Sequence, residues 1–145
     1  MIFRSPYPDI EIPEISLTQF ALRHADRLPN KPALIDAPTG RTLTYGELRK
    51  SIERAAAGLA EHGVQQHDVV ALFAPNSIEY VIAFQVIASL GATVSTVNPM
   101  SREVEVARQL ERHHVRFLVT VPELVVVAGV ASQELPVQEI FVIGE

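Results

Sequence analysis

The stretch from His67 to Pro99 decides the fold of this chain, and its first element is the run Val69-Val-Ala-Leu-Phe73. Five consecutive apolar residues are typical of a central strand that is covered on both faces of a parallel sheet. A Pro-Asn turn and an apolar helix to about Leu90 follow, and Gly91-Ala92 then separates this helix from a second strand, Val94–Val97, which we expect to be buried. The order of these segments predicts a β-α-β unit with two parallel strands.

The same alternation of helices and strands continues toward residue 145. We predict a helix from Ser101 to about His114, a strand at Arg116–Val119, a further helix, and a last strand at Ile140–Ile143. Strands that alternate with helices form a parallel sheet with helices on both faces when the crossovers are right-handed. The sequence therefore predicts an α/β fold with three layers and a mainly parallel sheet.

The residues before this unit predict an arm, a helix and a short hairpin. Residues 1–15 contain three prolines and no apolar period, so we expect an extended N-terminal arm that lies over a surface. A helix is expected from Ser16 to about Leu28, where a proline follows. Ala33–Asp36 and Arg41–Thr44 flank a turn that contains glycine, and they predict a short antiparallel β-hairpin.

Four helix starts carry a capping pattern, in which Ser, Thr or Asn is followed three residues later by Glu or Gln. The four pairs are Ser16–Gln19, Thr44–Glu47, Asn76–Glu79 and Thr120–Glu123. Such pairs satisfy free backbone amides in the first turn of a helix. We therefore interpret Glu47, Glu79 and Glu123 as capping residues rather than catalytic acids. Gly63 is interpreted as the glycine that ends the helix behind Thr44.

Length and composition limit the class of protein. A chain of 145 residues with 48% hydrophobic and 20% charged residues is typical of one globular domain. A net charge of −5 argues against a surface for nucleic acid, and the absence of cysteine excludes disulfides and thiolate chemistry. The longest apolar stretch, Ile78–Val97, is split by Gly91, so we expect core rather than a transmembrane segment. No secretory signal is evident, and we expect a cytoplasmic protein.

Motifs for catalysis, phosphate binding and metal binding are missing from the sequence. No two of the seven glycines form G-x-G, and the pair Gly58 and Gly63 is not followed by the Lys-Ser/Thr of a phosphate-binding loop. The five histidines do not have ligand spacing on one helix face, and no G-x-S-x-G occurs. We therefore predict no catalytic and no metal-binding residue in these 145 residues.

Two features of the sequence allow a functional interpretation as well as a structural one. The loop Asn98-Pro99-Met100-Ser101 follows a predicted parallel strand, and open α/β sheets bind ligands outside the carboxyl ends of such strands. Arg108, Arg112 and Arg116 are spaced by four residues and could meet an anionic cofactor, although a solvated helix face is the more common explanation.

Taken together, the motifs resemble the N-terminal part of the adenylate-forming acyl-CoA synthetases and ligases, and the 4-coumarate–CoA ligase branch in particular. The motifs that carry the resemblance are Thr44–Leu48, Asp68–Ser77, Gly91-Ala92 with Asn98-Pro99, and Glu105–Leu110. The resemblance covers about residues 16–143. One difference is His67, where many members of the family have glycine.

The resemblance implies that residues 16–145 are the N-terminal part of an AMP-binding, or adenylation, domain. In this family a carboxylic acid and ATP with Mg²⁺ give an acyl-adenylate, and the acyl group then passes to coenzyme A. ATP, Mg²⁺ and coenzyme A are thus the implied cofactors of a complete enzyme, and none is expected for this segment alone. The family's phosphate-binding loop and catalytic lysine are not found here, so no catalytic residue is implied. Asn98, Pro99 and Met100 are implied to lie toward coenzyme A.

Two functions remain open at this point. The first is an N-terminal fragment of an ATP-dependent carboxylic acid–CoA ligase that is inactive alone. The second is a free-standing α/β module that binds a nucleotide or a partner protein without catalysis. The apolar strand Ile140–Ile143 is a candidate exposed edge, through which the chain could associate with itself or with a partner chain.

Overall fold

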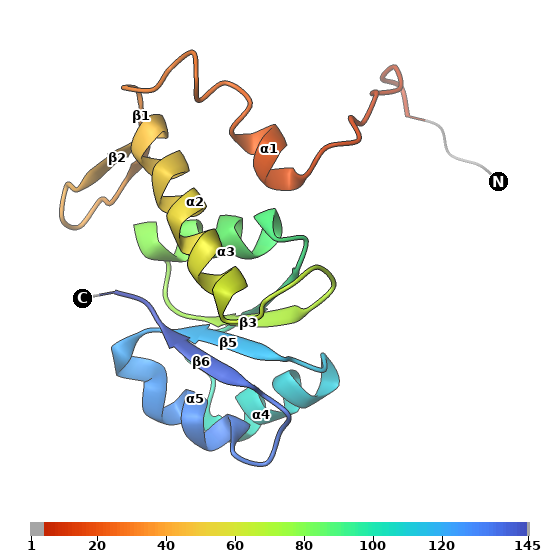
Figure 1. Ribbon diagram of the computed structural model, residues 1–145, viewed down its shortest axis with the longest axis vertical. Coiled ribbons are helices and arrows are strands. Elements are labelled where there is room, and N and C mark those ends of the chain that lie inside the picture. Colours follow the sequence, from red (N-terminus) through yellow and green to blue (C-terminus); the bar gives the residue numbers. More distant parts are fainter. Residues whose placement is uncertain (1–4, 145) are drawn as a thin grey trace.

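A four-stranded parallel sheet forms the centre of the protein, in a computed structural model that describes residues 5–144. The strand order is β4-β3-β5-β6, and helices cover both faces of the sheet (Figure 1). The strands are β3 (Val69–Phe73), β4 (Thr93–Val97), β5 (Phe117–Thr120) and β6 (Glu139–Val142). The predicted α/β fold with helices on both faces is confirmed.

The strand order explains which helices cover which face. The chain passes from β3 through α3 (Ile78–Ser89) to the edge strand β4, and it returns through α4 (Glu103–Arg112) to β5. It then continues through η1 (Pro122–Leu124) and α5 (Val125–Ser132) to the opposite edge, β6. Right-handed crossovers that run in opposite directions place their helices on opposite faces. Accordingly, α3 lies on one face of the sheet, and α4 and α5 lie on the other (Figure 1).

Strand β3 lies in the middle of the sheet, as its apolar sequence predicts. It pairs in parallel with β4 from Val69 to Phe73 and with β5 from Val70 to Phe73. Successive side chains of a strand point to opposite faces, so Ala71 and Phe73 pack beneath α4 and α5, whereas Val70 and Leu72 pack beneath α3. All four side chains are fully buried.

A further layer covers the outer side of α3. It consists of α2 (Tyr45–Glu61), the short helix α1 (Leu17–Ala21) and the antiparallel hairpin of β1 (Pro32–Ile35) and β2 (Thr42–Thr44). The apolar residues that join this layer to α3 are Leu22, Ala25, Leu48, Ile52 and Val86. The hairpin confirms the prediction from the sequence.

Two of the predicted capping pairs are confirmed in full. Ser16 with Gln19 caps α1 and Thr44 with Glu47 caps α2, and in both pairs the side chains and backbone amides bond reciprocally. Gly63 ends α2 as predicted, with a φ of 88°. Its amide donates to the carbonyl of Ala60 at 3.0 Å, which is one of the two bonds of a Schellman motif.

The other two predicted capping pairs are wrong. Helix α3 is capped by Ser77 rather than Asn76, and the Ser77 hydroxyl accepts a hydrogen bond from the Tyr80 amide at 3.0 Å. Thr120 does not cap a helix, because it belongs to β5 and its buried hydroxyl donates to the Phe73 carbonyl of β3 at 2.8 Å. Glu123 consequently does not complete a capping pair with it.

The first helix is much shorter than predicted. Helix α1 ends at Ala21 instead of Leu28, and turns follow, such as the 2.9 Å bond from the Ala25 amide to the Leu22 carbonyl. These turns bury Leu22 and Ala25 against α2 and α3. Packing against neighbouring helices, which local sequence does not encode, therefore ends α1 early.

The N-terminal arm is extended, but it does not lie over a surface as expected. Residues 5–15 are exposed throughout, with Ile10 and Ile12 exposed by 87% and 85%, and they project from the domain (Figure 1). Residues 1–4 of the predicted arm lie outside the described residues.

Candidate functional site

The loop Asn98-Pro99-Met100-Ser101 forms a compact exposed turn after β4. The Asn98 Oδ1 accepts a hydrogen bond from the Met100 amide at 2.9 Å, and the Asn98 carbonyl accepts one from the Ser101 amide at 2.9 Å. The Met100 side chain is 85% exposed. The loop thus lies at the carboxyl end of a parallel strand, as predicted. The pockets described below are lined by other residues, so its contact with coenzyme A stays a prediction.

The three arginines spaced by four do not form one surface. Arg116 Nη1 donates to both carboxylate oxygens of Asp68, at 2.7 and 3.0 Å, while Arg108 and Arg112 are exposed on α4. The Asp68 carboxylate also accepts from the Gln65 amide at 2.8 Å. Arg116 therefore joins the start of β5 to the loop before β3, which is a structural role.

A serine–histidine pair, which the sequence analysis missed, lies between β4 and α4. The Ser95 Oγ is 2.8 Å from His113 Nδ1, and Gln109 Nε2 donates to the same hydroxyl at 3.3 Å and to the Thr96 carbonyl at 2.8 Å. A hydroxyl beside an imidazole is one element of nucleophilic catalysis. Ser95 is only 6% exposed, however, so the pair holds the edge strand β4 to α4. Eighteen residues separate Ser95 from His113, and no motif spacing relates them.

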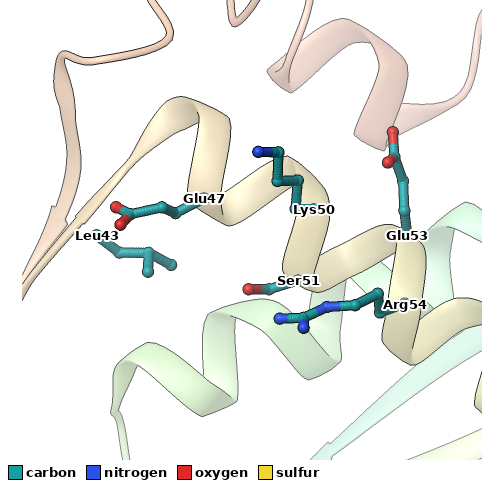
Figure 2. Close-up of a pocket in the computed structure, with 6 residues that line it drawn as sticks. All are labelled: Leu43, Glu47, Lys50, Ser51, Glu53 and Arg54. Atoms are coloured by element: carbon teal, nitrogen blue, oxygen red, sulfur yellow. The ribbon is translucent and has the colours of Figure 1, made fainter.

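A shallow polar pocket of about 440 Å³ lies on the exposed surface of α2. Figure 2 shows its lining residues, which are Leu43, Glu47, Lys50, Ser51, Glu53 and Arg54. Hydrogen bonds from the Thr44 backbone and hydroxyl hold the pKa of the Glu47 carboxyl below its usual range. Apart from Leu43, every lining side chain comes from one helix (Figure 2). The pocket is the solvated, charged face of α2, and Glu47 has its capping role there.

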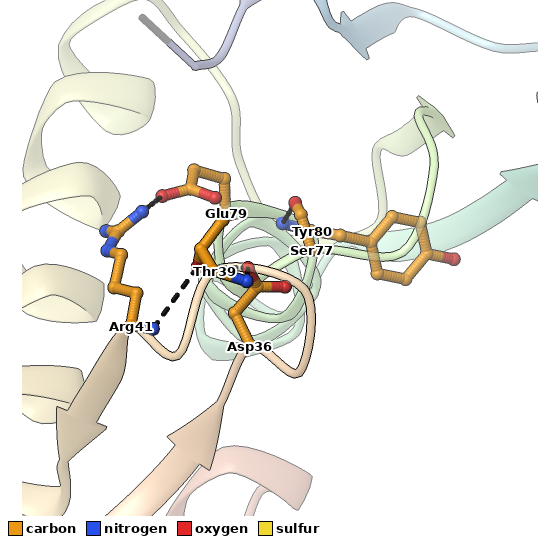
Figure 3. A network of polar contacts seen from close by, with 6 residues as sticks. All are labelled: Asp36, Thr39, Arg41, Ser77, Glu79 and Tyr80. Carbon is orange, nitrogen blue, oxygen red and sulfur yellow. Dashed lines mark hydrogen bonds and ion pairs between the residues drawn. The ribbon is translucent and has the colours of Figure 1, made fainter.

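A polar network joins the hairpin turn to the first turn of α3 (Figure 3). Arg41 of the hairpin forms an ion pair with Glu79 of α3, and its amide donates to Thr39 Oγ1 at 3.2 Å. Asp36 accepts hydrogen bonds from the Thr39 amide and hydroxyl. Burial raises the pKa of the Glu79 carboxyl, but its hydrogen bonds and the charge of Arg41 outweigh burial and lower it overall. The predicted pair of Glu79 with an Asn76 cap is wrong: its carboxylate pairs with Arg41, and hydrogen bonds from its own amide and from the Ser77 hydroxyl at the start of α3 help to lower its pKa.

An apolar pocket of about 260 Å³ lies between α2, α3 and the carboxyl ends of β5 and β6. Its lining residues are Ala55, Leu59, Glu79, Ile82, Ala83, Val86, Val119, Phe141, Ile143 and Gly144. We call this pocket the α2–α3 groove. All of these residues except Glu79 and Gly144 are apolar, so the groove offers hydrophobic contact and one carboxylate.

The floor of the α2–α3 groove is the outer part of the sheet. Phe141 of the edge strand β6 stacks on Phe117 with ring centroids 6.0 Å apart, and it meets the His62 ring edge-on at 5.5 Å. The Glu139 carboxylate lies 3.0 Å from His62 Nδ1 and ties β6 to the end of α2. Phe141 and Ile143 remain only partly buried. Helices α2 and α3 therefore cover their face of β6 only in part.

Two classes of site are not found in the described part of the chain. Between residues 5 and 144, no three His, Asp or Glu side chains gather in a way that could hold a metal ion. No helix in the same range is long and apolar enough to span a membrane.

Comparisons with known proteins agree with this fold. The sequence profile of a family described as AMP-binding enzyme matches residues 22–143. A 4-coumarate–CoA ligase of Narcissus pseudonarcissus is 38% identical over 120 residues, which cover 82% of this chain and 22% of that protein. A 4-coumarate–CoA ligase of Oryza sativa subsp. japonica is 39% identical over 134 residues, which cover 90% of this chain and 25% of that protein. The crystal structure of a long-chain-fatty-acid–CoA ligase from Archaeoglobus fulgidus superimposes with a TM-score of 0.89 at 24% identity, over 99% of this chain and 30% of that one.

The match over residues 22–143 shows that the chain belongs to the AMP-binding enzyme family. It spans about a quarter of the length of the curated relatives named above, which are 4-coumarate–CoA ligases.

Proposed function

We propose that this chain is the N-terminal part of the adenylation domain of an ATP-dependent carboxylic acid–CoA ligase. The complete enzyme would join an acid to AMP with release of pyrophosphate and then transfer the acyl group to coenzyme A. The observation that carries the proposal is the family match over residues 22–143, together with 38% identity to a curated 4-coumarate–CoA ligase. Residues 16–145 would form the scaffold of that domain.

We propose that the chain alone does not catalyse either step. Its polar groups support this, because they already serve structural roles: the Ser95 hydroxyl is buried, Arg116 pairs with Asp68, and Glu79 pairs with Arg41. ATP, Mg²⁺ and coenzyme A would be needed by the complete protein rather than by this segment. We also propose a cytoplasmic location, because the complete enzyme would use ATP and coenzyme A.

The loop at Asn98, Pro99 and Met100 is proposed to face coenzyme A in the complete enzyme. Its position at the carboxyl end of β4 supports the proposal, since that edge of a parallel sheet is where ligands bind in open α/β folds. The internal bond from the Met100 amide to Asn98 keeps the turn compact and the Met100 side chain exposed.

The experiment for the proposed function is ATP–pyrophosphate exchange with 4-coumaric acid and with a fatty acid. The chain alone should give no exchange above background, and a complete 4-coumarate–CoA ligase is the positive control. Co-expression with a polypeptide that supplies the rest of the family domain should restore exchange. Exchange by the isolated chain would contradict the proposal.

A second candidate function is a free-standing α/β module that binds a partner without catalysis. One observation favours it: within residues 5–144, β6 pairs only with β5, so its other edge is open for pairing. Sedimentation at increasing protein concentration tests self-association, and titration calorimetry with ATP and coenzyme A tests nucleotide binding. A monomer that binds neither compound would count against this function.

A further inference from the structure

The N-terminal arm presents apolar side chains to solvent. Ile10 and Ile12 are exposed by 87% and 85%. In an extended segment successive side chains point to opposite sides, so Ile10 and Ile12 share one side of the arm, while Asp9 and Glu11 share the other. The arm is therefore a short amphipathic strand with one apolar side and one acidic side.

A groove of about 530 Å³ lies between α2 and the segment formed by α1 and the turns that follow it. We call it the α1–α2 groove. Its apolar lining residues are Leu22, Ile52 and Ala56, and its other lining side chains are polar or charged. Its volume is in the range of binding clefts, roughly 300–1,000 Å³. The groove thus offers an apolar floor between charged walls.

The charged groups of the α1–α2 groove favour an acidic occupant on the α1 side. Asp26 already pairs with Arg49. Arg23 forms no ion pair within residues 5–144: its guanidinium lies 3.9 Å from the centroid of the Phe20 ring and donates to the Phe20 carbonyl at 2.7 Å. Glu53 lines the groove from α2. An acidic strand is therefore attracted to Arg23 and repelled from the α2 wall.

The arm of the same chain does not enter this groove. A capping box holds Ser16 in an extended conformation, with φ −63° and ψ 153°, and the Ile15 amide donates to the Pro13 carbonyl at 2.9 Å. The arm consequently leaves α1 on the side away from α2 (Figure 1). A second copy of the chain can offer its groove to an arm that projects in this way.

We propose that two copies of this chain exchange their N-terminal arms, so that each arm lies in the α1–α2 groove of the other copy. Ile10 and Ile12 pack on the apolar floor, and Glu11 pairs with Arg23 at the rim. Because each copy gives one arm and receives one, a twofold axis closes the dimer. This self-association goes beyond the proposed function and does not depend on it.

Sedimentation equilibrium of the full chain measures the dissociation constant of the dimer. The double variant Ile10→Ser, Ile12→Ser should raise it about tenfold or more, because the arm loses its apolar side. Ile35→Ser is the matched control, since Ile35 is an isoleucine of the hairpin that is 67% exposed, and it should leave the constant unchanged. The arm variants should keep the wild-type midpoint of thermal unfolding, because these arm side chains are exposed.

Charge reversal tests the pairing across the two copies. Glu11→Arg and Arg23→Glu should each raise the dissociation constant about fivefold, and the variant that carries both should recover to within about twofold of the wild type. Glu111→Arg on the exposed surface of α4 changes the net charge equally and should have no effect. Recovery requires that the two positions meet, which a merely destabilising change does not produce.

Engineered cysteines show which copy supplies the arm, because the chain has none of its own. A chain with Ile12→Cys and a differently tagged chain with Glu53→Cys should form a mixed disulfide under mild oxidation. Glu111→Cys in place of Glu53→Cys is the control, which should give little mixed disulfide.

The inference is overturned if the wild-type chain stays monomeric at every concentration, if the Ile10 and Ile12 changes leave association intact, or if the charge-reversed pair does not recover. Association that only Val142→Lys abolishes would assign the dimer to the open edge of β6 instead. A disulfide within a single chain that carries both Ile12→Cys and Glu53→Cys would show that the arm returns to its own groove.

Discussion

Arg41 and Glu79 are separated by 38 residues and form an ion pair that joins the hairpin to the first turn of α3. The Glu79 side chain is 30% exposed, so the pair is only partly screened by water. The pair also lies at the rim of the α2–α3 groove. It links the N-terminal layer to the helix that covers β3 and β4.

Glu79→Gln should destabilise the chain at pH 7 and not at low pH. The pKa of Glu79 is lowered in the folded state, so its contribution is present above the unfolded value, near 4.5, and is lost as the pH falls through the folded pKa. We expect a loss of about 0.5–1 kcal/mol at pH 7, in the range of partly exposed ion pairs. Urea unfolding at pH 7 and at acid pH measures it. Glu53→Gln on the exposed face of α2 is the control, and an equal loss for Glu79→Gln at both pH values would contradict the prediction.

Arg116→Leu should be more damaging than the same change at Arg108. Asp68 has a side chain that is 10% exposed, and without Arg116 its charge stays in a poorly solvated place. We expect a loss of about 1–3 kcal/mol in the free energy of unfolding for Arg116→Leu and almost none for the exposed Arg108→Leu. Denaturant unfolding compares the two variants. Similar small effects would show that the Asp68 pair contributes little.

Thr120→Val should cost about 1 kcal/mol of stability although it conserves shape, because the Phe73 carbonyl loses a buried hydrogen bond from the hydroxyl. Thr96→Val is the control, since Thr96 is an exposed strand residue. Chemical denaturation of both variants gives the difference. A neutral Thr120→Val would mean that the β3–β5 pairing alone satisfies this carbonyl.

Gly91→Ala and Gly58→Ala should change stability in opposite directions. Gly91 has a φ of 72°, and a Cβ there would lie 2.9 Å from the Gln66 side chain. We expect Gly91→Ala to cost about 1–2 kcal/mol. Gly58 lies inside α2 with open space around it, so Gly58→Ala should stabilise by about 0.5–1 kcal/mol. Thermal unfolding checks both signs, and a stabilising Gly91→Ala would contradict the assignment of its turn.

His114→Gly should stabilise the chain. His114 follows α4 with a φ of 51°, and its amide donates to the Glu111 carbonyl at 3.0 Å as in a Schellman motif. Glycine adopts this backbone conformation without the cost that other residues bear, and a gain of about 0.5–1 kcal/mol is expected. Urea unfolding measures it, with His24→Gly in the exposed turns after α1 as a comparison that should give no gain.

Most of the sheet could be predicted from local pattern because β3, β5 and β6 each contain at least three consecutive apolar residues between helix signals. The match of β3 to Val69–Phe73 illustrates this. The capping pairs show where such reasoning stops. Thr44 and Thr120 stand in the same pattern, but Thr120 lies beside the Phe73 carbonyl in the sheet and bonds there instead.

The candidate site could be predicted only as a position along the chain. The loop at Asn98–Met100 follows a strand, and its place at the carboxyl edge was evident from the order of elements. The α2–α3 groove was not, since its lining comes from two helices, two strands and the segment after β6. No spacing along the chain brings Ala55 near Phe141.

Local sequence alone specified the family motifs, the order of strands and helices, the parallel sheet and two helix caps, because these depend on neighbours within a few residues and on apolar periodicity. The three-dimensional packing determined the early end of α1, the partners of Glu79, Thr120 and Arg116, and the groove over β6. Those features depend on which groups meet across long separations in the chain. Burial and charge pairing, rather than helix or strand propensity, determine where α1 ends and which partners these side chains bind.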